Sequence, residues 1–470
     1  MPSSASSFLF TISLAMAVSL PLVASSSATT VRAGYYLAGA ARLRPLAELD
    51  ASLYTHLYYS ALAVHPTTHK LVLPTDPAEA ALLAAFSPAL KTKNPALRTL
   101  LSVGTATTTT AADIAGATAT DPAFSAMASD PSSRAAFVAA AVALARDLGF
   151  DGLDVAWRFP SSAAEMAHLG FLLSDLRAAA ATPGFLLTAT VYFSSHVLAG
   201  VDYPSEAMAS CLDWVNVAAF GLRPSPPVVP ATTAFDAPLY DRATHFSASY
   251  GVVSWIDAGV PEGKVVMGVP LYGRSWFLRN KANHGVGAPV VAAGPKQRGS
   301  NATGVMAYAE VAQLLLSGAG DGRSAVATAA AAAYDNASVA SYVAVGDVWV
   351  AFDAVAVVAE KLAFAARRGL LGYFLWPVNY DDANLTVDGD SHSLGSVAAS
   401  EVWMQNEMSS SSKNGTGVRQ TQEPVRLPPA TEPAGTPGPV PAPASGSSAL
   451  WLPWTKLDAF LHLALLILVW

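Results

Sequence analysis

Cysteine is nearly absent from this sequence. The 470 residues include one, Cys211, so no disulfide can form within the chain, and we interpret this lone cysteine as a buried small side chain. Charged residues are also scarce and make up 13% of the chain. The net charge is −7, and no block of Lys or Arg occurs. This balance argues against a nucleic-acid partner.

Apolar residues, in contrast, make up 52% of the chain, although much of that share is alanine and part of it lies at the two ends. The length allows two or three average domains, or one large barrel with additional segments. We expect neither a cofactor nor a bound metal ion.

Residues 1–28 are typical of a secretory signal peptide. Phe8–Val23 is an apolar run, and the small residues of Ala24–Thr30 follow it. Since no Lys or Arg precedes the run, a membrane anchor is the alternative, although the run is short for a membrane span. Four Asn-x-Ser/Thr sequons agree with secretion and predict glycosylation; they begin at Asn301, Asn336, Asn384 and Asn414.

The composition changes abruptly near the C-terminus. Residues 405–448 are rich in Ser, Pro and Gly and predict a disordered stalk that ends in the small residues Ser445–Ser448. Residues 449–470 then form a spacer and the apolar tail Phe460–Trp470. This order is typical of a signal for a glycosylphosphatidylinositol (GPI) anchor, with a short membrane tail as the alternative. We expect a secreted protein held on the outer face of the plasma membrane by a C-terminal lipid anchor.

Residues 31–404 alternate β-branched apolar runs with alanine-rich stretches, which indicates a parallel sheet with crossover helices. Eight runs qualify as strands, which is the number in a closed barrel: Val31–Leu37, Thr55–Val64, Arg98–Val103, Phe150–Trp157, Phe185–Phe193, Trp214–Phe220, Val265–Leu271 and Leu370–Trp376. The long gap before the eighth run predicts an insertion at about 276–353. The expected fold class is therefore α/β, a (β/α)8 TIM barrel with a small α+β insertion domain between strand 7 and strand 8.

The helix expected before the fourth strand illustrates the local pattern. Ser133 can cap its N-terminus, and Gly149 can end it. Its apolar residues recur at helical spacing and form one face: Phe137, Ala141, Leu144 and Leu148.

Side chains alternate along the fourth strand, so Asp154, Ala156 and Arg158 share one face. That face must point into the barrel, because helices cover the outside. Asp151 is out of step with this set and is a poor candidate for the interior. Asp154 is open to two interpretations, as a residue of a functional site or as a buried, hydrogen-bonded barrel residue.

The segment Asp151-Gly-Leu-Asp154-Val-Ala156-Trp-Arg158 resembles the Asp-Gly-x-Asp-x-Asp-x-Glu signature of family 18 glycoside hydrolases, the chitinases. Further patches, in the same order along residues 31–403, are similar to plant class V chitinase-like proteins of that family. These patches are Gly34–Tyr36, Leu53–Leu57, Thr99–Gly104, Met127–Arg134, Leu212–Asn216, Gly268–Trp276 and Gly369–Trp376.

The resemblance implies a mechanism in which the N-acetyl carbonyl of the sugar attacks the anomeric carbon, while a Glu protonates the leaving oxygen and an Asp orients the acetamido group. Here Arg158 stands at the Glu position and Ala156 at the Asp position, and Phe220 and Gly221 replace a Tyr-Asp pair. A guanidinium group keeps its proton near neutral pH, so Arg158 cannot act as the acid, and its positive charge opposes a cationic transition state. We therefore expect this motif to be degenerate, with no catalytic residue.

Part of the sugar cleft is nevertheless kept. The resemblance places Trp376 on the floor of the cleft, where a pyranose ring can stack, and Tyr35, Tyr272 and Arg274 along its lining. Each of these ligand-binding candidates can equally belong to the core. Arg158 can also form a salt bridge with Asp154 that replaces the carboxylate network and partly fills the cleft.

These observations lead us to expect a catalytically inactive, extracellular chitinase-like protein that binds a chitin-type oligosaccharide, another N-acetylglucosamine glycan, or a protein partner. Two alternatives stay open. One is a residual chitinase, for which Asp151 and Asp154 are the only carboxylates left in the signature. The other is an inhibitor of other glycosidases or a structural wall component, since a fold alone does not fix function.

Overall fold

The computed structural model describes residues 30–104, 121–181, 183–197, 200–223, 229–296, 298, 302–317, 332–382, 386–387, 390–391 and 393–400. The expected leader (1–28), stalk (405–448) and C-terminal tail (449–470) lie outside these ranges, as do the sequons at Asn301, Asn384 and Asn414. None of the described helices is both long enough and apolar enough to cross a lipid bilayer.

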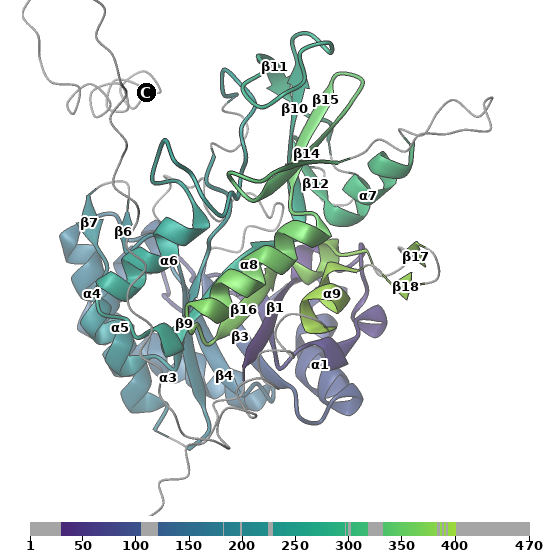
Figure 1. The fold of residues 1–470 in the computed structure, drawn as a ribbon. Coiled ribbons are helices and arrows are strands. Elements are labelled where there is room, and N and C mark those ends of the chain that lie inside the picture. The colour runs from purple at the N-terminus through teal and green to yellow at the C-terminus, as the bar shows by residue number, and fades with distance from the viewer. Residues whose placement is uncertain are drawn as a thin grey trace, which may run out of the picture. The chain divides into compact units, whose positions relative to one another are not determined.

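Eight parallel strands close into a barrel (Figure 1). They are β1 (Val31–Leu37), β2 (His56–Leu62), β3 (Arg98–Gly104), β4 (Gly152–Ala156), β5 (Leu186–Val191), β8 (Trp214–Val217), β9 (Val265–Pro270) and β16 (Gly372–Trp376). Around the barrel their order is β1-β16-β9-β8-β5-β4-β3-β2, so each strand lies beside its neighbours in the chain and β16 closes onto β1. All eight strands lie where the sequence predicts them, and most are shorter than the apolar runs that contain them.

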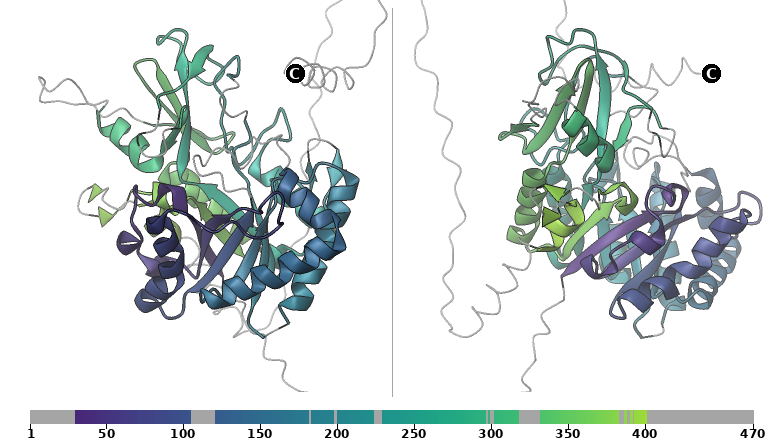
Figure 2. Two further views of the ribbon diagram at one scale, coloured as in Figure 1. Left: turned by 180° about the vertical axis from the view of Figure 1, so that it is seen from behind. Right: turned by 90° about the vertical axis from the view of Figure 1, so that its right-hand side faces the viewer.

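Helices surround the barrel, as the views in Figure 2 show. They are α1 (Pro77–Lys93), α2 (Pro122–Ser129), α3 (Pro131–Asp147), α4 (Ala163–Ala179), α5 (Ser205–Cys211), α6 (Ala248–Asp257), α8 (Val355–Arg367) and α9 (Leu394–Ser400). Two short hairpins lie outside the barrel, β6 (His196–Val197) with β7 (Val201–Asp202) and β17 (Thr386–Val387) with β18 (Asp390–Ser391). Cys211, expected to be buried, is only half-buried at the end of α5.

The ends of α3 follow from its sequence, with one correction. Its N-cap is Asp130, whose carboxylate accepts a hydrogen bond from the Ser133 backbone N–H at 2.7 Å. Ser133, the expected cap, lies inside the helix, because Pro131 fits the first helical position and the helix starts there, so that the cap is Asp130. Gly149 follows the C-terminus with φ of 74°, the left-handed conformation that ends a helix, as predicted.

The buried face of α3 also differs in part from the prediction. Phe137 and Ala141 are buried as expected, whereas Leu144 and Leu148 are half-buried. The buried face also includes three smaller residues, namely Val138, Val142 and Ala145.

Between β9 and α8 the chain forms the predicted α+β insertion, which stands beside one end of the barrel in Figures 1 and 2. Its strands follow the order β11-β10-β15-β14-β13, with β12 paired to β10. Its elements are β10 (Tyr272–Leu278), β11 (Val290–Ala293), β12 (Val305–Ala307), α7 (Tyr308–Ser317), β13 (Ala333–Asp335), β14 (Ala340–Val345) and β15 (Val348–Phe352). Trp276 and Trp349 anchor a separate small core in this sheet, and the sequon residue Asn336 is exposed between β13 and β14.

A buried carboxylate joins α9 to the segment that follows β16. Asp381 follows β16 and accepts hydrogen bonds from the backbone N–H groups of Leu394 (2.9 Å) and Gly395 (3.0 Å), which begin α9. The guanidinium of Arg44 lies 3.9 Å away. Burial raises the pKa of Asp381 from 3.8 to about 6, because the amides and Arg44 offset only part of the desolvation.

This pKa predicts a pH-dependent effect of Asp381→Asn. The folded state holds the Asp381 proton more tightly than the unfolded state, so the stability it contributes is present below about pH 4 and is lost as the pH rises through about 6. Relative to the parent, the Asn variant should therefore gain about 2 kcal/mol in free energy of unfolding between pH 4 and pH 7. Urea unfolding of both proteins across this range measures the difference.

Asp151→Asn is the matched control, because the pKa of Asp151 is lowered rather than raised. Both folded and unfolded states of Asp151 are ionised from pH 5 to pH 7, so its effect should stay constant there. A constant difference for Asp381→Asn as well would contradict the assignment.

Candidate functional site

A layer of polar side chains crosses the barrel interior around Asp154. Strand register creates it, since Asp154 on β4 lies opposite Ser102 on β3 and Thr188 on β5. The Asp154 carboxylate is fully buried and accepts hydrogen bonds from Ser102 Oγ (2.7 Å), Thr188 Oγ1 (2.8 Å), Thr190 Oγ1 (2.9 Å), Tyr35 Oη (3.2 Å) and Asn216 Nδ2 (3.4 Å). Of the two interpretations that the sequence leaves open, Asp154 matches the buried, hydrogen-bonded barrel residue.

Two tyrosines extend this layer toward β2. The rings of Tyr35 and Tyr58 stack with their centroids 4.2 Å apart, and Asn216 Nδ2 donates to both hydroxyls, at 2.8 and 3.1 Å. Burial and the neighbouring Asp154 raise the pKa of both tyrosines. They therefore stay neutral near physiological pH and act as hydrogen-bonding groups of the barrel interior.

Asp154 and Asp151 have opposite environments. Burial raises the pKa of Asp154, and the hydrogen bonds from the surrounding hydroxyls do not offset it. Asp151 precedes β4 and pairs with Lys91 Nζ (2.8 Å) and Arg98 Nη1 (3.0 Å). Partial burial of Asp151 raises its pKa, but these cations and the Thr99 backbone N–H outweigh burial, so the net shift is downward. Asp151 lies away from the barrel interior, as its position in the alternation predicts.

The carboxyl end of β4 carries the altered signature positions. β4 ends at Ala156, and both Ala156 and Arg158 are buried. Trp157 between them points outward and stacks on Phe124 of α2, with centroids 5.2 Å apart. This outward tryptophan confirms the alternation on which the sequence argument depends.

The prediction of a salt bridge between Arg158 and Asp154 is wrong. None of the ion pairs among the described residues joins these two side chains, although both are buried. The physical reason is that hydroxyl and amide donors from β1, β3, β5 and β8 already occupy the Asp154 oxygens.

Phe220 and Gly221 follow β8 at the same end of the barrel. The Phe220 ring is fully buried and makes edge contacts with Tyr272 (centroids 6.2 Å apart) and Phe374 (5.9 Å). Gly221 has φ of 68°, a left-handed conformation that costs other residues more than glycine. An aromatic ring without a hydroxyl and a residue without a side chain therefore stand where the family pattern has a Tyr-Asp pair.

The four candidate ligand-binding residues are all buried. Tyr35, Tyr272, Arg274 and Trp376 are at most 3% exposed. Tyr35 and Trp376 lie in contact, with ring centroids 5.2 Å apart. Their role in sugar binding stays a prediction, and a sugar can stack on Trp376 only if the groups around its ring move.

Tyr272 and Arg274 belong to a buried ionic cluster that the sequence analysis did not predict. The carboxylate of Asp236 accepts hydrogen bonds from Tyr272 Oη (3.0 Å) and Arg274 Nε (3.3 Å). Lys361 on α8 pairs with Asp353 after β15 and also donates to the Ala237 carbonyl at 2.7 Å. Burial raises the pKa of Asp353, and Lys361 opposes that rise. Two carboxylates and two cationic side chains thus connect the segment between β8 and α6, the insertion and α8.

The residues around Asp154 carried a signal in the sequence, whereas this ionic cluster did not. Ser102, Thr188, Thr190 and Asn216 are polar residues inside apolar runs, a sign of a hydrogen-bonded barrel interior. Asp236 lies 36 and 38 residues from Tyr272 and Arg274, and Lys361 lies 124 residues from Ala237. Over the described part of the molecule, no group of three or more His, Cys, Asp and Glu is placed to hold a metal ion.

Asp154→Ala should lower the free energy of unfolding by about 3 kcal/mol, because several buried donors lose their acceptor. Asp154→Asn keeps one oxygen acceptor and should cost less than half as much. Asp147→Ala, at an exposed position on α3, is the control and should change stability by less than about 0.5 kcal/mol. Urea denaturation measures all three, and an Asp154→Ala variant as stable as the control would contradict the assigned network.

Comparison with known proteins places this arrangement in a family. Residues 31–381 match the sequence profile of glycosyl hydrolases family 18. Nod factor hydrolase protein 1 of Medicago truncatula is 35% identical over 373 residues, which cover 77% of this chain and 89% of that protein.

Two solved structures are similar over most of the chain. A mutant class V chitinase from Nicotiana tobaccum, solved in complex with NAG4, is 32% identical with a TM-score of 0.68 and covers 79% of this chain and 98% of its own. The chitinase-like agglutinin RobpsCRA from Robinia pseudoacacia is 30% identical with a TM-score of 0.64, covering 78% of this chain and 98% of its own. The resemblance to plant class V chitinases is confirmed, and the chain belongs to glycosyl hydrolases family 18.

Proposed function

We propose that this protein is a chitinase-like family member that does not hydrolyse chitin. One observation carries the proposal: the carboxyl end of β4, which supplies the acid in the family pattern, carries Ala156 and Arg158, both buried. Arg158 keeps its proton and its positive charge near neutral pH, so it cannot protonate a leaving oxygen. Its charge also opposes the positive charge that develops on the sugar in the mechanism that the resemblance implies.

Neither remaining carboxylate of the signature is a suitable replacement. A raised pKa suits a general acid, but Asp154 has no exposed surface and its oxygens are held by donors from four other strands of the barrel. Asp151 lies away from the barrel interior in ion pairs with Lys91 and Arg98. A residual chitinase would therefore need an acid from another element.

For the ligand, we propose N-acetylglucosamine oligosaccharides of the chitin type. The support is that a similar class V chitinase was solved with NAG4 and that a similar structure is a chitinase-like agglutinin. Trp376 offers the flat apolar ring that sugar stacking requires. Because this ring is buried, we propose that binding requires a rearrangement at the barrel mouth.

A second candidate is recognition of a protein, as an inhibitor of other glycosidases. The burial of Tyr35, Tyr272, Arg274 and Trp376 favours it, since a closed mouth offers little surface to a sugar. Capture on chitin beads and capture on immobilised secreted glycosidases distinguish the two candidates.

Isothermal titration with chitotetraose tests the binding proposal. We expect measurable affinity for the parent protein and a loss of at least about fivefold for Trp376→Ala, since one stacking aromatic contributes on the order of 1 kcal/mol or more. Phe171→Ala is the matched control, because Phe171 is an exposed aromatic on α4. Absence of binding by a folded parent would contradict the sugar ligand while leaving the lack of hydrolysis unaffected.

We also propose that the protein is displayed outside the cell through a C-terminal GPI anchor, on the basis of its leader, sequons and apolar tail. Treatment of expressing cells with a phosphatidylinositol-specific phospholipase should release it into the medium. Truncation before residue 449 should give a protein that is secreted without treatment. Retention of the full-length protein after phospholipase treatment would favour the short membrane tail.

A further inference from the structure

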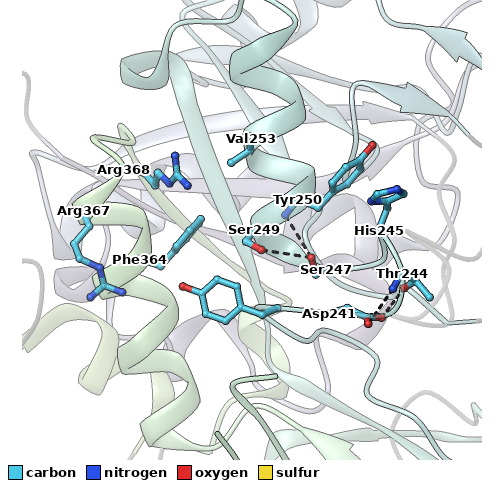
Figure 3. A pocket seen from close by; sticks show the side chains of 11 residues that line it. Asp241, Thr244, His245, Ser247, Ser249, Tyr250, Val253, Phe364, Arg367 and Arg368 are labelled. Atoms are coloured by element: carbon cyan, nitrogen blue, oxygen red, sulfur yellow. Dashed lines mark hydrogen bonds between the residues drawn. The ribbon is translucent and has the colours of Figure 1, made fainter. Parts of the chain in front are cut away.

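A cavity of about 490 Å³ lies on the outside of the barrel between α6 and α8 (Figure 3). Phe364, Arg367 and Arg368 form one side of it, at the end of α8, and Tyr250 and Val253 contribute from α6. None of its lining residues is among those of the barrel mouth described above.

Aromatic rings give this cavity flat apolar surfaces. Tyr240 and Tyr250 are both more than one-third exposed. The Tyr240 ring meets Phe364 edge to face with centroids 6.2 Å apart, and His245 stacks on Tyr250 at 4.5 Å. Rings that are fixed by neighbouring rings and still reach solvent suit stacking against a sugar.

The charge balance of the cavity favours an anion. Its one carboxylate, Asp241, is already occupied by Arg223 at 3.5 Å and by the backbone N–H groups of Ala243 (2.8 Å) and Thr244 (3.2 Å). Arg367 and Arg368, in contrast, are both exposed.

These two arginines are weakly neutralised. The carboxylate nearest Arg367 within the described ranges is Glu360, at 4.0 Å and largely exposed, which is a weak pair. Among the described residues no carboxylate lies within 4 Å of Arg368, whose guanidinium rests 5.7 Å from the centre of the Phe364 ring. Two guanidinium groups beside exposed aromatic rings can bind a carboxylate and a sugar ring together.

We propose that this cavity is a second glycan-binding site, specific for an acidic saccharide built of uronic acid units. Exposed tyrosines stack against the pyranose faces, and Arg367 and Arg368 bind the carboxylates. Hydroxyl groups of Thr244, Ser247 and Ser249 line the same cavity and can hydrogen-bond to sugar hydroxyls. The site is independent of the barrel mouth and of the proposed lack of hydrolysis.

Titration of the full chain with tetragalacturonate tests the proposal, with cellotetraose as the neutral sugar of equal length. We expect binding of the acidic tetramer that weakens as NaCl is raised from 50 to 500 mM, and at least about tenfold weaker binding of cellotetraose. Saturating chitotetraose should not displace the acidic tetramer. Equal affinity for the neutral sugar, no binding of the acidic tetramer, or displacement by chitotetraose would each overturn the proposal.

Variants assign the binding to the cavity. Arg367→Ala/Arg368→Ala and Tyr250→Ala should each weaken tetragalacturonate binding at least about tenfold with little change in melting temperature, because these side chains are exposed. Arg279→Ala removes an exposed arginine from the insertion as the matched control and should change the affinity less than about twofold. Unchanged affinity in the double variant would overturn the charge assignment. Inorganic phosphate bound as tightly as the tetramer would overturn the role of the rings.

Discussion

The hydrogen bonds that Asp154 accepts from four other strands of the barrel, two of them adjacent to β4, hold the interior of the barrel in one register. A buried carboxylate is costly unless it is well hydrogen-bonded, so Ser102, Thr188 and Thr190 on the adjacent strands are needed to keep it there. A shift of β4 by one residue would replace Asp154 with an apolar side chain and turn the carboxylate toward the helices. The same alternation fixes where Ala156 and Arg158 lie, and so the chemistry of the barrel mouth follows from this layer.

Outside that layer, buried charged side chains form ion pairs and hydrogen bonds with each other. Asp236 interacts with Tyr272 and Arg274, and Lys361 pairs with Asp353, all of them buried. A working site keeps some charged groups available for the substrate, whereas these are occupied by intramolecular partners. Within the described residues, the exposed arginines at the end of α8 instead lie on the outside of the barrel.

The barrel, the insertion and the orientation of β4 could be predicted from sequence, because strand alternation, helix periodicity and Gly149 are local signals. Other predictions were wrong or missing because neighbouring groups compete for one role, or because a contact joins residues that are far apart in the chain. Asp130 displaced Ser133 as the cap of α3 because Pro131 begins the helix earlier. The predicted Arg158–Asp154 ion pair does not form because hydroxyl donors on separate strands occupy the carboxylate. The contact between Lys361 and Ala237 could not be predicted, because the two residues are 124 positions apart and no local pattern connects them.

The central claim is that the end of β4, where the family pattern has its acid, presents no group able to protonate a departing sugar. The most direct measurement is the rate at which the purified, folded chain cleaves chitotetraose, compared under the same conditions with a working class V chitinase. Loss of both the acid and the orienting carboxylate predicts a rate at least about 10⁴-fold lower at every pH from 4 to 8. Cleavage at a rate comparable to that of the working enzyme would contradict the account.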